Sequence, residues 1–320
     1  MDSGDAPRDP DATLGDAAPG DAWTVDDATD VHCIETGMYG VSGYGAVYLV
    51  AGAEPALVET GIGANTDAVL DAVVDLGVEL ADLAAVLVTH VHLDHAGGAG
   101  RVLERCPDAT LAVHEAGAPH LVDPGALVDG TKRAVGEAWR HYGEPVPVPE
   151  DRVRPLAHGD RVPLGDRDLV AHACPGHAPH QVVFADTLDG SVFAGDAAGI
   201  WVPDREQVRE TTPPPQFDLE AALADVETVR DLGPERLLFT HFGPGPDRVD
   251  RVLDRYRARL VGWVEAVRRA RERLGDDAAV ADHFAAEAVE TVGSVWGERK
   301  ARQEARLNVR GVLAYLDGRE

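Results

Sequence analysis

Four side chains that can bind a metal lie within six consecutive residues of this chain. The run His90-Val91-His92-Leu93-Asp94-His95 directly follows an apolar stretch, residues 84–89, that reads as a buried strand. Imidazole nitrogens and a carboxylate gathered at one turn repel one another or stay unsatisfied unless a cation holds them. These donors bind zinc at about 2.0–2.1 Å and also suit iron or manganese. The run therefore predicts a metal site where the strand ends.

The segment around this run resembles the metal-binding signature of the metallo-β-lactamase superfamily, through the residues THVHLDH at 89–95. Members of that family present their ligands on loops at one sheet edge of an αββα sandwich. The family's remaining ligands have counterparts here in the same order: CPGHAPH contains His177, SVFAGD contains Asp196 and LLFTHFGP contains His241. The resemblance covers roughly residues 31–246 and favours the glyoxalase II-like branch.

The resemblance implies two metal ions held by seven side chains. It places His90, His92 and His177 on one metal, Asp94, His95 and His241 on the other, and Asp196 as a bridge between them. The implied cofactor is two Zn²⁺ ions, with iron or manganese as compatible alternatives. Asp94 is also the expected catalytic residue, which accepts or orients a proton.

Two further residues are expected close to the ligands. Glu59, in Glu59-Thr60-Gly61, stands where relatives usually have aspartate, and we expect it to orient a ligand histidine through the second ring nitrogen. The alternative for Glu59 is a strand-end carboxylate in water. His180 follows His177 by three residues and either approaches the cleft or serves the structure alone. The remaining histidines are expected to be structural or belong to no motif: His114, His120, His172, His32, His141, His158 and His283.

This ligand set predicts a metal-dependent hydrolase. Two bridged cations lower the pKa of a shared water from about 15.7 toward about 7, so that a metal-bridged hydroxide can attack a carbonyl carbon or a phosphorus. We expect a small-molecule substrate, first a small thioester or another carboxylic ester. The alternatives are a mononuclear non-haem iron oxygenase resembling persulfide dioxygenase, a lactonase or phosphodiesterase, and a non-catalytic binding module.

The composition limits the partners of the protein. The formal net charge is -27, from 56 acidic and 29 basic residues, and only Lys132 and Lys300 are lysines. A densely anionic surface repels nucleic acid, so none is expected as a partner. Arginine in place of lysine on such a chain is typical of salt-loving archaea, which predicts a halophilic, haloarchaeal protein. The alternative is an ordinary acidic enzyme.

The cysteine pattern and the hydropathy predict a cytoplasmic protein that does not enter a membrane. Cys33, Cys106 and Cys174 lie far apart and are odd in number, so we expect reduced thiols rather than disulfides. No apolar run reaches the length of a membrane span, and no signal peptide is visible. The sequence leaves the oligomeric state open, a homodimer included.

Strand and helix patterns alternate along the chain, which predicts a mixed α/β fold of two βα halves packed as a sandwich. The expected strands are residues 31–35, 46–51, 56–59, 84–89, 110–114, 168–173, 181–186, 191–195 and 236–240. The expected helices are residues 65–77, 93–106 and 218–231 in the sandwich, and segments after 246, at 278–289 and at 298–316 beyond it.

Three regions are expected along the chain. Residues 1–22 are rich in Asp, Ala, Gly and Pro and should form a disordered acidic leader. Residues 23–246 should form the catalytic domain, and residues 247–320 a small α-helical C-terminal subdomain. Within the catalytic domain, residues 129–142 form an amphipathic segment with a proline-rich tail, which we interpret as an insertion near the substrate cleft.

Overall fold

The computed structural model describes residues 17–319, so most of the predicted leader, residues 1–16, lies outside the described residues. Residues 17–22 contact the body of the protein: the Gly20 amide donates to the Glu35 carbonyl at 2.8 Å. Ordered contacts therefore begin before residue 23. None of the helices in the described part is apolar over a length that would cross a bilayer.

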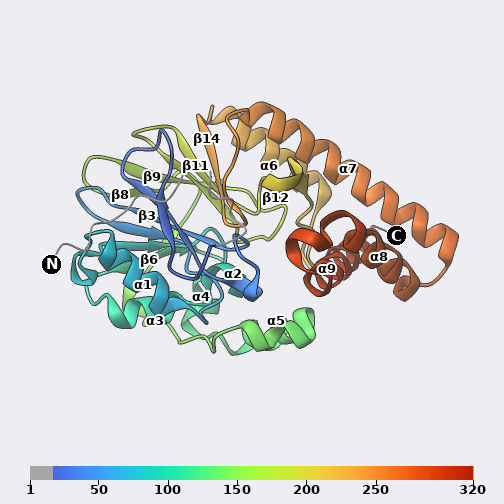
Figure 1. The fold of residues 1–320 in the computed structure, drawn as a ribbon, viewed down its shortest axis with the longest axis horizontal. Helices are drawn as coiled ribbons and strands as arrows, with labels where there is room; N and C mark the ends of the chain where they lie inside the picture. Colours follow the sequence, from blue (N-terminus) through green and yellow to red (C-terminus); the bar gives the residue numbers. More distant parts are fainter. Residues whose placement is uncertain (1–16, 320) are drawn as a thin grey trace.

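Two large sheets form the centre of the structure (Figure 1). The first sheet has the strand order β1-β2-β3-β4-β5-β6-β7, and the second has β15-β14-β11-β10-β9-β8. The first sheet contains β1 (Ala22–Thr24), β2 (Val31–Glu35), β3 (Ala46–Val50), β4 (Ala56–Val58), β5 (Ala85–Leu87), β6 (Thr110–His114) and β7 (Val153–Leu156). The second contains β8 (Arg161–Pro163), β9 (Asp168–Ala173), β10 (Val182–Asp186), β11 (Ser191–Gly195), β14 (Arg236–Phe239) and β15 (Gly243–Pro244). A separate hairpin pairs β12 (Ile200–Val202) with β13 (Gln207–Arg209).

Helices lie on the outer faces of both sheets and at one end of the sandwich (Figure 1). In the first half these are α1 (Thr66–Asp75), α2 (Leu93–Ala96), α3 (Ala99–Arg105), α4 (Ala118–Val122) and α5 (Gly125–Val135). In the second half they are α6 (Leu219–Asp231), α7 (Val249–Leu274), α8 (Asp277–Trp296) and α9 (Glu298–Asp317). Short 3₁₀ turns occupy Met38–Gly40, Leu80–Asp82, Gly136–His141, Glu150–Arg152 and Pro203–Arg205.

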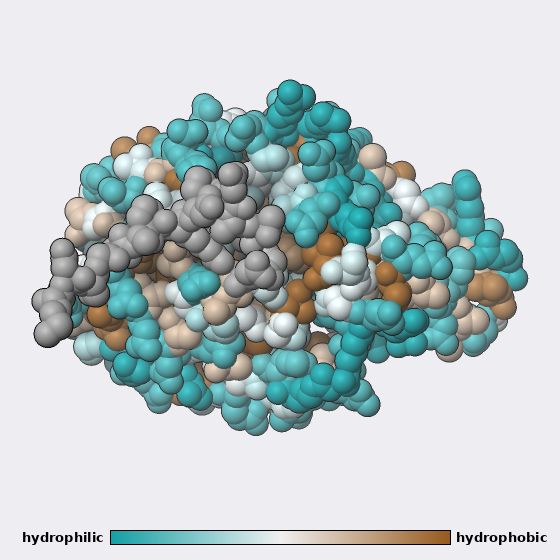
Figure 2. All heavy atoms as spheres, viewed as in Figure 1, coloured by the Kyte–Doolittle hydropathy of each residue, from teal (hydrophilic) through white to brown (hydrophobic). Residues whose placement is uncertain are grey.

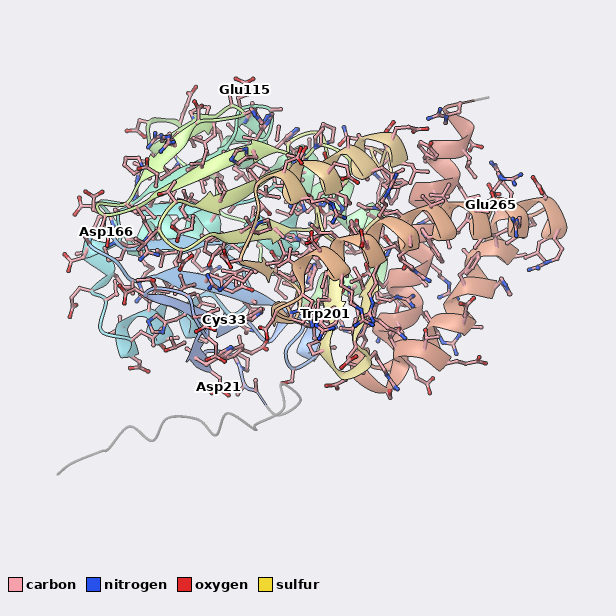
Figure 3. All side chains as sticks on the ribbon, turned by 90° about the horizontal axis from the view of Figure 1, so that it is seen from above. Asp21, Cys33, Glu115, Asp166, Trp201 and Glu265 are labelled. Atoms are coloured by element: carbon pink, nitrogen blue, oxygen red, sulfur yellow. The ribbon has the colours of Figure 1, made fainter. Side chains whose placement is uncertain are left out.

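Three apolar clusters bind these layers together. Residues of both sheets, such as Tyr48 and Phe184, are buried between the sheets. The helices α1 and α3 pack on the first sheet, and α6 and α7 pack on the second (Figure 1). The predicted αββα sandwich with a C-terminal helical region is confirmed. Viewed from above, α7–α9 form one end of the molecule, with Glu265 near the tip and Asp166 at the opposite end (Figure 3).

Strand direction places the predicted ligands at one edge. The strands β4, β5, β6 and β7 are parallel, with Leu57, Val86 and Leu111 in register, and β11 is parallel to β14. The carboxyl ends of parallel strands meet at one edge of a sheet, which is where open α/β sheets bind ligands. The predicted ligand run follows β5, and two further candidates follow β11 and β14.

The helix expected over residues 93–106 is two helices, α2 and α3, and this expectation was wrong. Gly97 and Gly98 separate them beside the loop that follows β4. A Cβ on Gly97 would lie 2.9 Å from the Ile62 carbonyl carbon, and one on Gly98 would lie 2.6 Å from the Thr60 carbonyl oxygen. Only glycine allows this close backbone approach, which brings the first turn of α2 against the loop beyond Glu59.

The C-terminal helices begin and end close to their predicted positions, except that α8 continues to Trp296 instead of ending near 289. The hairpin of α8 and α9 turns at Gly297, whose φ is 77°. Its residues Val292, Trp296 and Ala301 pack against Met38 and Tyr44 of the sandwich. These helices thereby cover the edge at which the ligands gather.

Candidate metal centre

The structure brings all seven predicted ligands to the same edge of the sandwich. His90 and His92 lie on the turn between β5 and α2, Asp94 and His95 lie in α2, and His177 lies on the loop between β9 and β10. Asp196 and His241 directly follow the buried strands β11 and β14. The strands that precede these residues are buried in the core, which fixes the positions of the turns and loops that carry the side chains.

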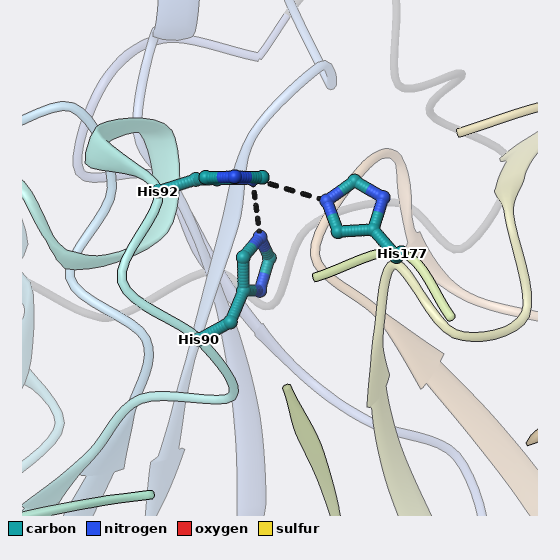
Figure 4. Close-up of side chains that lie close together, drawn as sticks. All are labelled: His90, His92 and His177. Atoms are coloured by element: carbon teal, nitrogen blue, oxygen red, sulfur yellow. Dashed lines mark hydrogen bonds between the residues drawn. The ribbon is translucent and has the colours of Figure 1, made fainter. Parts of the chain in front are cut away.

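Three imidazoles form the first cluster (Figure 4). The Nδ1 atom of His92 lies 3.0 Å from Nε2 of His90 and 3.0 Å from Nε2 of His177. Burial, and then the neighbouring imidazoles, lower the pKa of His90 well below its usual value. Burial also lowers the pKa of His92 to about 4, against the opposing effect of Asp94. Both rings are therefore neutral at neutral pH, which is the form that binds a metal.

Asp94, His95 and His241 form the second cluster, with one donor atom from each within 4.8 Å of the others. Burial raises the pKa of Asp94, but His95 and then His241 outweigh this effect and lower it to about 2. Asp94 is therefore ionised at neutral pH. A carboxylate with two imidazoles is a common donor set for a divalent transition metal.

Asp196 lies between the two clusters, and its two oxygens face different sides. Oδ2 is 3.3 Å from Nε2 of His177 in the first cluster. Oδ1 is 3.7 Å from Nε2 of His95 and 3.5 Å from Nε2 of His241 in the second. A carboxylate that reaches one cluster with each oxygen has the placement of a bridging ligand.

Two buried atoms at this point test whether the residues fit a metal. Within residues 17–319, Asp196 Oδ1 and His95 Nε2 have no hydrogen-bond partner. An unsatisfied buried polar atom costs about 1–3 kcal/mol, more when charged, and a cation between these atoms removes that cost. Burial also raises the pKa of Asp196 to about 7, partly offset by His95. The donor set therefore fits a divalent metal.

The outward ring nitrogens of four histidines are held by neighbouring groups. Nδ1 of His177 lies 3.1 Å from the Thr211 carbonyl, and Nδ1 of His241 lies 3.2 Å from the Tyr44 carbonyl. Nδ1 of His90 lies 3.1 Å from Thr89 Oγ1. Such contacts fix the ring orientation and leave Nε2 free to bind a metal.

Glu59 holds the outward ring nitrogen of the fourth histidine, His95. Its Oε1 lies 3.3 Å from Nδ1 of His95. The same oxygen accepts hydrogen bonds from the hydroxyls of Thr89 and Thr240 at 2.5 and 3.2 Å. Only 1% of Glu59 is exposed, so its carboxylate is not solvated. The longer side chain at this position therefore reaches His95, and its role in orienting a metal ligand stays a prediction.

His180 lies on the wall of the site and in none of the ligand groups that the described residues form. Its Nδ1 accepts a hydrogen bond from the Val91 amide at 3.4 Å, and its ring stacks on His90 with centroids 6.2 Å apart. Burial, and then His92, lower the pKa of His180 to about 3. The neutral ring supports the backbone of the ligand run.

A cavity of about 520 Å³ opens from the clusters toward the C-terminal helices. The predicted insertion does line it, although its helix α5 begins earlier than expected and ends in the 3₁₀ turn Gly136–His141. In the space-filling view, apolar residues gather where the C-terminal helices meet the body (Figure 2). The size and the mixed lining are those of a small-molecule site.

Sequence reasoning missed a second group of side chains in this cavity. The hydroxyls of Tyr39 and Tyr142 lie 2.5 Å apart, and Lys300 Nζ lies 3.8 Å from the centre of the Tyr39 ring. Lys300 also pairs with Glu304 at 2.8 Å. Nothing in the local pattern around these residues marks them. The available signal was that Lys300 is one of two lysines in an arginine-rich chain.

Comparison with known proteins agrees with this geometry. Residues 41–241 match the family model described as the metallo-beta-lactamase superfamily. An acyl-coenzyme A thioesterase from Gallus gallus is 34% identical over 119 residues, which are 34% of this chain and 40% of that protein. An uncharacterized protein from Bacillus subtilis is 26% identical over 195 residues, 59% of this chain and 78% of that protein.

Solved structures share the fold at low sequence identity. An archaeal metallo-β-lactamase superfamily protein from Sulfolobus tokodaii is 20% identical with a TM-score of 0.67, covering 89% of this chain and 99% of that one. A metallo-β-lactamase family protein from Thermus thermophilus is 22% identical with a TM-score of 0.58, covering 86% and 89%. With the family match over most of the sandwich and the ligand set at its edge, the chain belongs to the metallo-β-lactamase superfamily.

Proposed function

We propose that this protein is a two-metal hydrolase that cleaves a small thioester or another carboxylic ester. The position of Asp196 carries the proposal, because its two oxygens face two separate groups of ligand side chains. We assign one metal to His90, His92 and His177 and the other to Asp94, His95 and His241, and zinc is the cation that this donor set favours.

When bound, a pair of divalent cations supplies Lewis acidity, which lowers the pKa of a water molecule and polarises the substrate carbonyl. The protein's own groups complete the reaction. Asp94 is ionised and can accept a proton at a carboxylate oxygen. Burial raises the pKa of both Tyr39 and Tyr142 well above the usual value. The next cause is the neighbouring Tyr142 for Tyr39 and the Asp94 carboxylate for Tyr142. Both hydroxyls therefore stay protonated. Because one of them donates to the other, one O–H of the pair remains to donate to a substrate oxygen.

A thioester is our first choice among the esters. Its hydrolysis joins the oxygen of water to the carbonyl carbon, breaks the C–S bond and yields a carboxylic acid and a thiol. The thioesterase from Gallus gallus supports this choice, although the matched region spans less than half of that protein.

We further propose a haloarchaeal origin and a cytoplasmic setting, supported by the net charge of -27 and by three buried free cysteines.

A substrate panel tests the proposed reaction. Metal-replete protein in molar salt would be assayed on acyl thioesters, carboxylic esters and lactones, with phosphodiesters and β-lactams as comparisons. We expect turnover of thioesters or carboxylic esters above that of phosphodiesters and β-lactams. Turnover confined to phosphodiesters, or oxygen consumption on persulfides by iron-loaded protein, would contradict the proposal.

A further inference from the structure

Residues of α9 from Lys300 to Arg310 line the cavity. We call the end at Lys300 the reaction end, because it lies nearest the candidate ligands. Near the start of this helix, Lys300 Nζ lies 4.6 Å from the centre of the Tyr44 ring, which itself lies 4.9 Å from the His241 ring. Arg310 lines the same cavity ten residues further along α9. At a rise of 1.5 Å per residue the two positions are about 15 Å apart along the helix axis. A bound molecule can therefore reach from the candidate ligands to a distant second end.

The second end lies at the seam between α9 and α5. The Arg310 guanidinium donates to the Ala134 carbonyl of α5 at 2.6 Å, and Arg133 lies next to Ala134 in the chain. Both arginines line the cavity. Between the two ends the lining is mixed, with apolar contributions from Leu127, Leu307, Pro213 and Pro214 and polar ones from Gln303 and Asn308.

The charges of these two arginines are not neutralised by the protein. Over residues 17–319 neither Arg133 nor Arg310 has a carboxylate within salt-bridge distance. Other cationic groups of the cavity are paired: Arg306 with Asp282 at 2.8 Å and Lys300 with Glu304. Both guanidinium groups are exposed to solvent, so neither charge is committed to an anionic partner within the protein. Both groups are therefore available to bind a ligand anion at the seam.

We infer that the substrate carries an anionic terminus, a phosphate or a carboxylate, on the thiol side of its thioester, and that Arg133 and Arg310 bind this terminus at the α5–α9 seam. The inference rests on the proposed thioester hydrolysis and adds the substrate class to it. Guanidinium groups match phosphate and carboxylate oxygens in a two-pronged geometry. The electrophilic carbonyl would then lie at the reaction end, and the middle of the cavity, with its mixed lining, would hold the connecting arm.

Kinetics on matched thioesters test this assignment. The same acyl group would be presented on coenzyme A, which ends in phosphates, on glutathione, which ends in carboxylates, and on pantetheine, which is uncharged. We expect at least one charged thioester to exceed the pantetheine thioester in kcat/KM by about tenfold or more, mainly through KM. Arg133→Ala and Arg310→Ala should each remove most of this preference and leave turnover of the pantetheine thioester nearly unchanged.

Arg302→Ala is the matched control, because Arg302 lies on the same helix outside the cavity lining. Binding of S-methyl coenzyme A and S-methyl pantetheine to the metal-loaded protein, measured by calorimetry, separates this inference from the proposed reaction. Tighter binding of the charged thioether that is lost in both arginine variants supports the anion site even without thioester turnover. Equal kcat/KM for charged and neutral thioesters, or a preference that survives both substitutions, overturns the inference while the hydrolase proposal stands.

Discussion

At the scale of single residues, the candidate ligands and Glu59 could be selected from the sequence, whereas the backbone groups that contact the ligand rings could not. The run from His90 to His95 is local, so its spacing alone indicated a metal. The contacts that orient the rings come from backbone carbonyls at Thr211 and Tyr44, which carry no side-chain signature. Glu59 was found because it lies at a strand end that the family resemblance marked.

Asp196→Ala should abolish hydrolysis more completely than His180→Ala. Asp196 is the side chain that faces both clusters, whereas His180 contacts the Val91 backbone at the wall of the cavity. We expect loss of at least one metal and of most turnover for Asp196→Ala, by about 100-fold or more, and retention of both metals for His180→Ala. Elemental analysis and turnover of both variants provide the check. Near-normal turnover of Asp196→Ala with two metals would refute the bridging assignment.

Glu35 should make folding stability depend on pH. Burial raises its pKa from 4.5 to about 7, although the amides of Gly37 and Gly43 donate to the carboxylate and oppose the shift. Between these two values the folded state holds a proton that the unfolded state has released. The contribution of Glu35 to the free energy of unfolding therefore falls as pH rises, by up to about 1.4 kcal/mol per pH unit.

Glu35→Gln removes this titration and leaves a pH-independent cost, because an amide nitrogen cannot accept from a backbone amide. The difference in unfolding free energy, variant minus wild type, should therefore increase from about pH 5 to about pH 7 and level off above it. Chemical denaturation across this range measures the difference. A difference that stays flat would show that Glu35 does not carry the shifted proton.

At the scale of elements, two of the strands missed by the sequence analysis share a physical cause. β7 contains Pro155 and β8 contains Pro163, and each forms the edge of its sheet. Proline lowers the strand signal but is tolerated at an edge, where no neighbour needs its missing N–H. The break between α2 and α3 was missed because its cause is the close approach of another loop, which helical periodicity does not report.

The helix α9 is linked to the candidate metal centre through the segment Thr211–Thr212. Gly311 packs so closely on Thr212 that an added Cβ would lie 1.9 Å from its carbonyl oxygen. The backbone amide of Thr212 also donates a hydrogen bond to Asn308 Oδ1 of α9, at 2.5 Å. The preceding residue, Thr211, holds the Nδ1 side of His177 through its carbonyl. Displacing α9 should therefore disturb a ligand.

Gly311→Ala should lower the free energy of unfolding by about 1–3 kcal/mol, as overpacking of a core does, and should weaken metal retention. Gly262→Ala is the matched control, since a Cβ at this position of α7 meets nothing within 4 Å. It should stabilise the protein by about 0.5–1 kcal/mol. Denaturant titrations and metal content of the two variants give the comparison. Equal stability of both variants would mean that α9 is not held at Gly311.

At the scale of the whole molecule, the charge predicts a dependence on salt. With a net charge of -27, carboxylate repulsion opposes the compact state in dilute buffer. In molar potassium chloride the screening length falls to about 3 Å, which suppresses this repulsion. The melting temperature should therefore rise along a salt series. A protein that melts no earlier in dilute buffer than in molar salt would contradict the halophilic interpretation.

The layers of the sandwich followed from alternating patterns along the sequence, but the cavity depends on how distant segments meet. Its walls come from α5 and α9, which are more than 160 residues apart in the chain. No local pattern encodes that juxtaposition. The identity of the cavity's unpaired arginines, and with it the inferred substrate class, could therefore emerge only from the three-dimensional arrangement.

The central claim is that two metals, bridged by Asp196, support hydrolysis. The most direct measurement is thioester turnover as zinc is added stepwise to metal-depleted protein in molar salt. Our account predicts that activity rises until about two equivalents per chain are bound and then levels off. Full activity at one equivalent would contradict it, and so would a protein that binds two equivalents and hydrolyses neither thioesters nor other carboxylic esters.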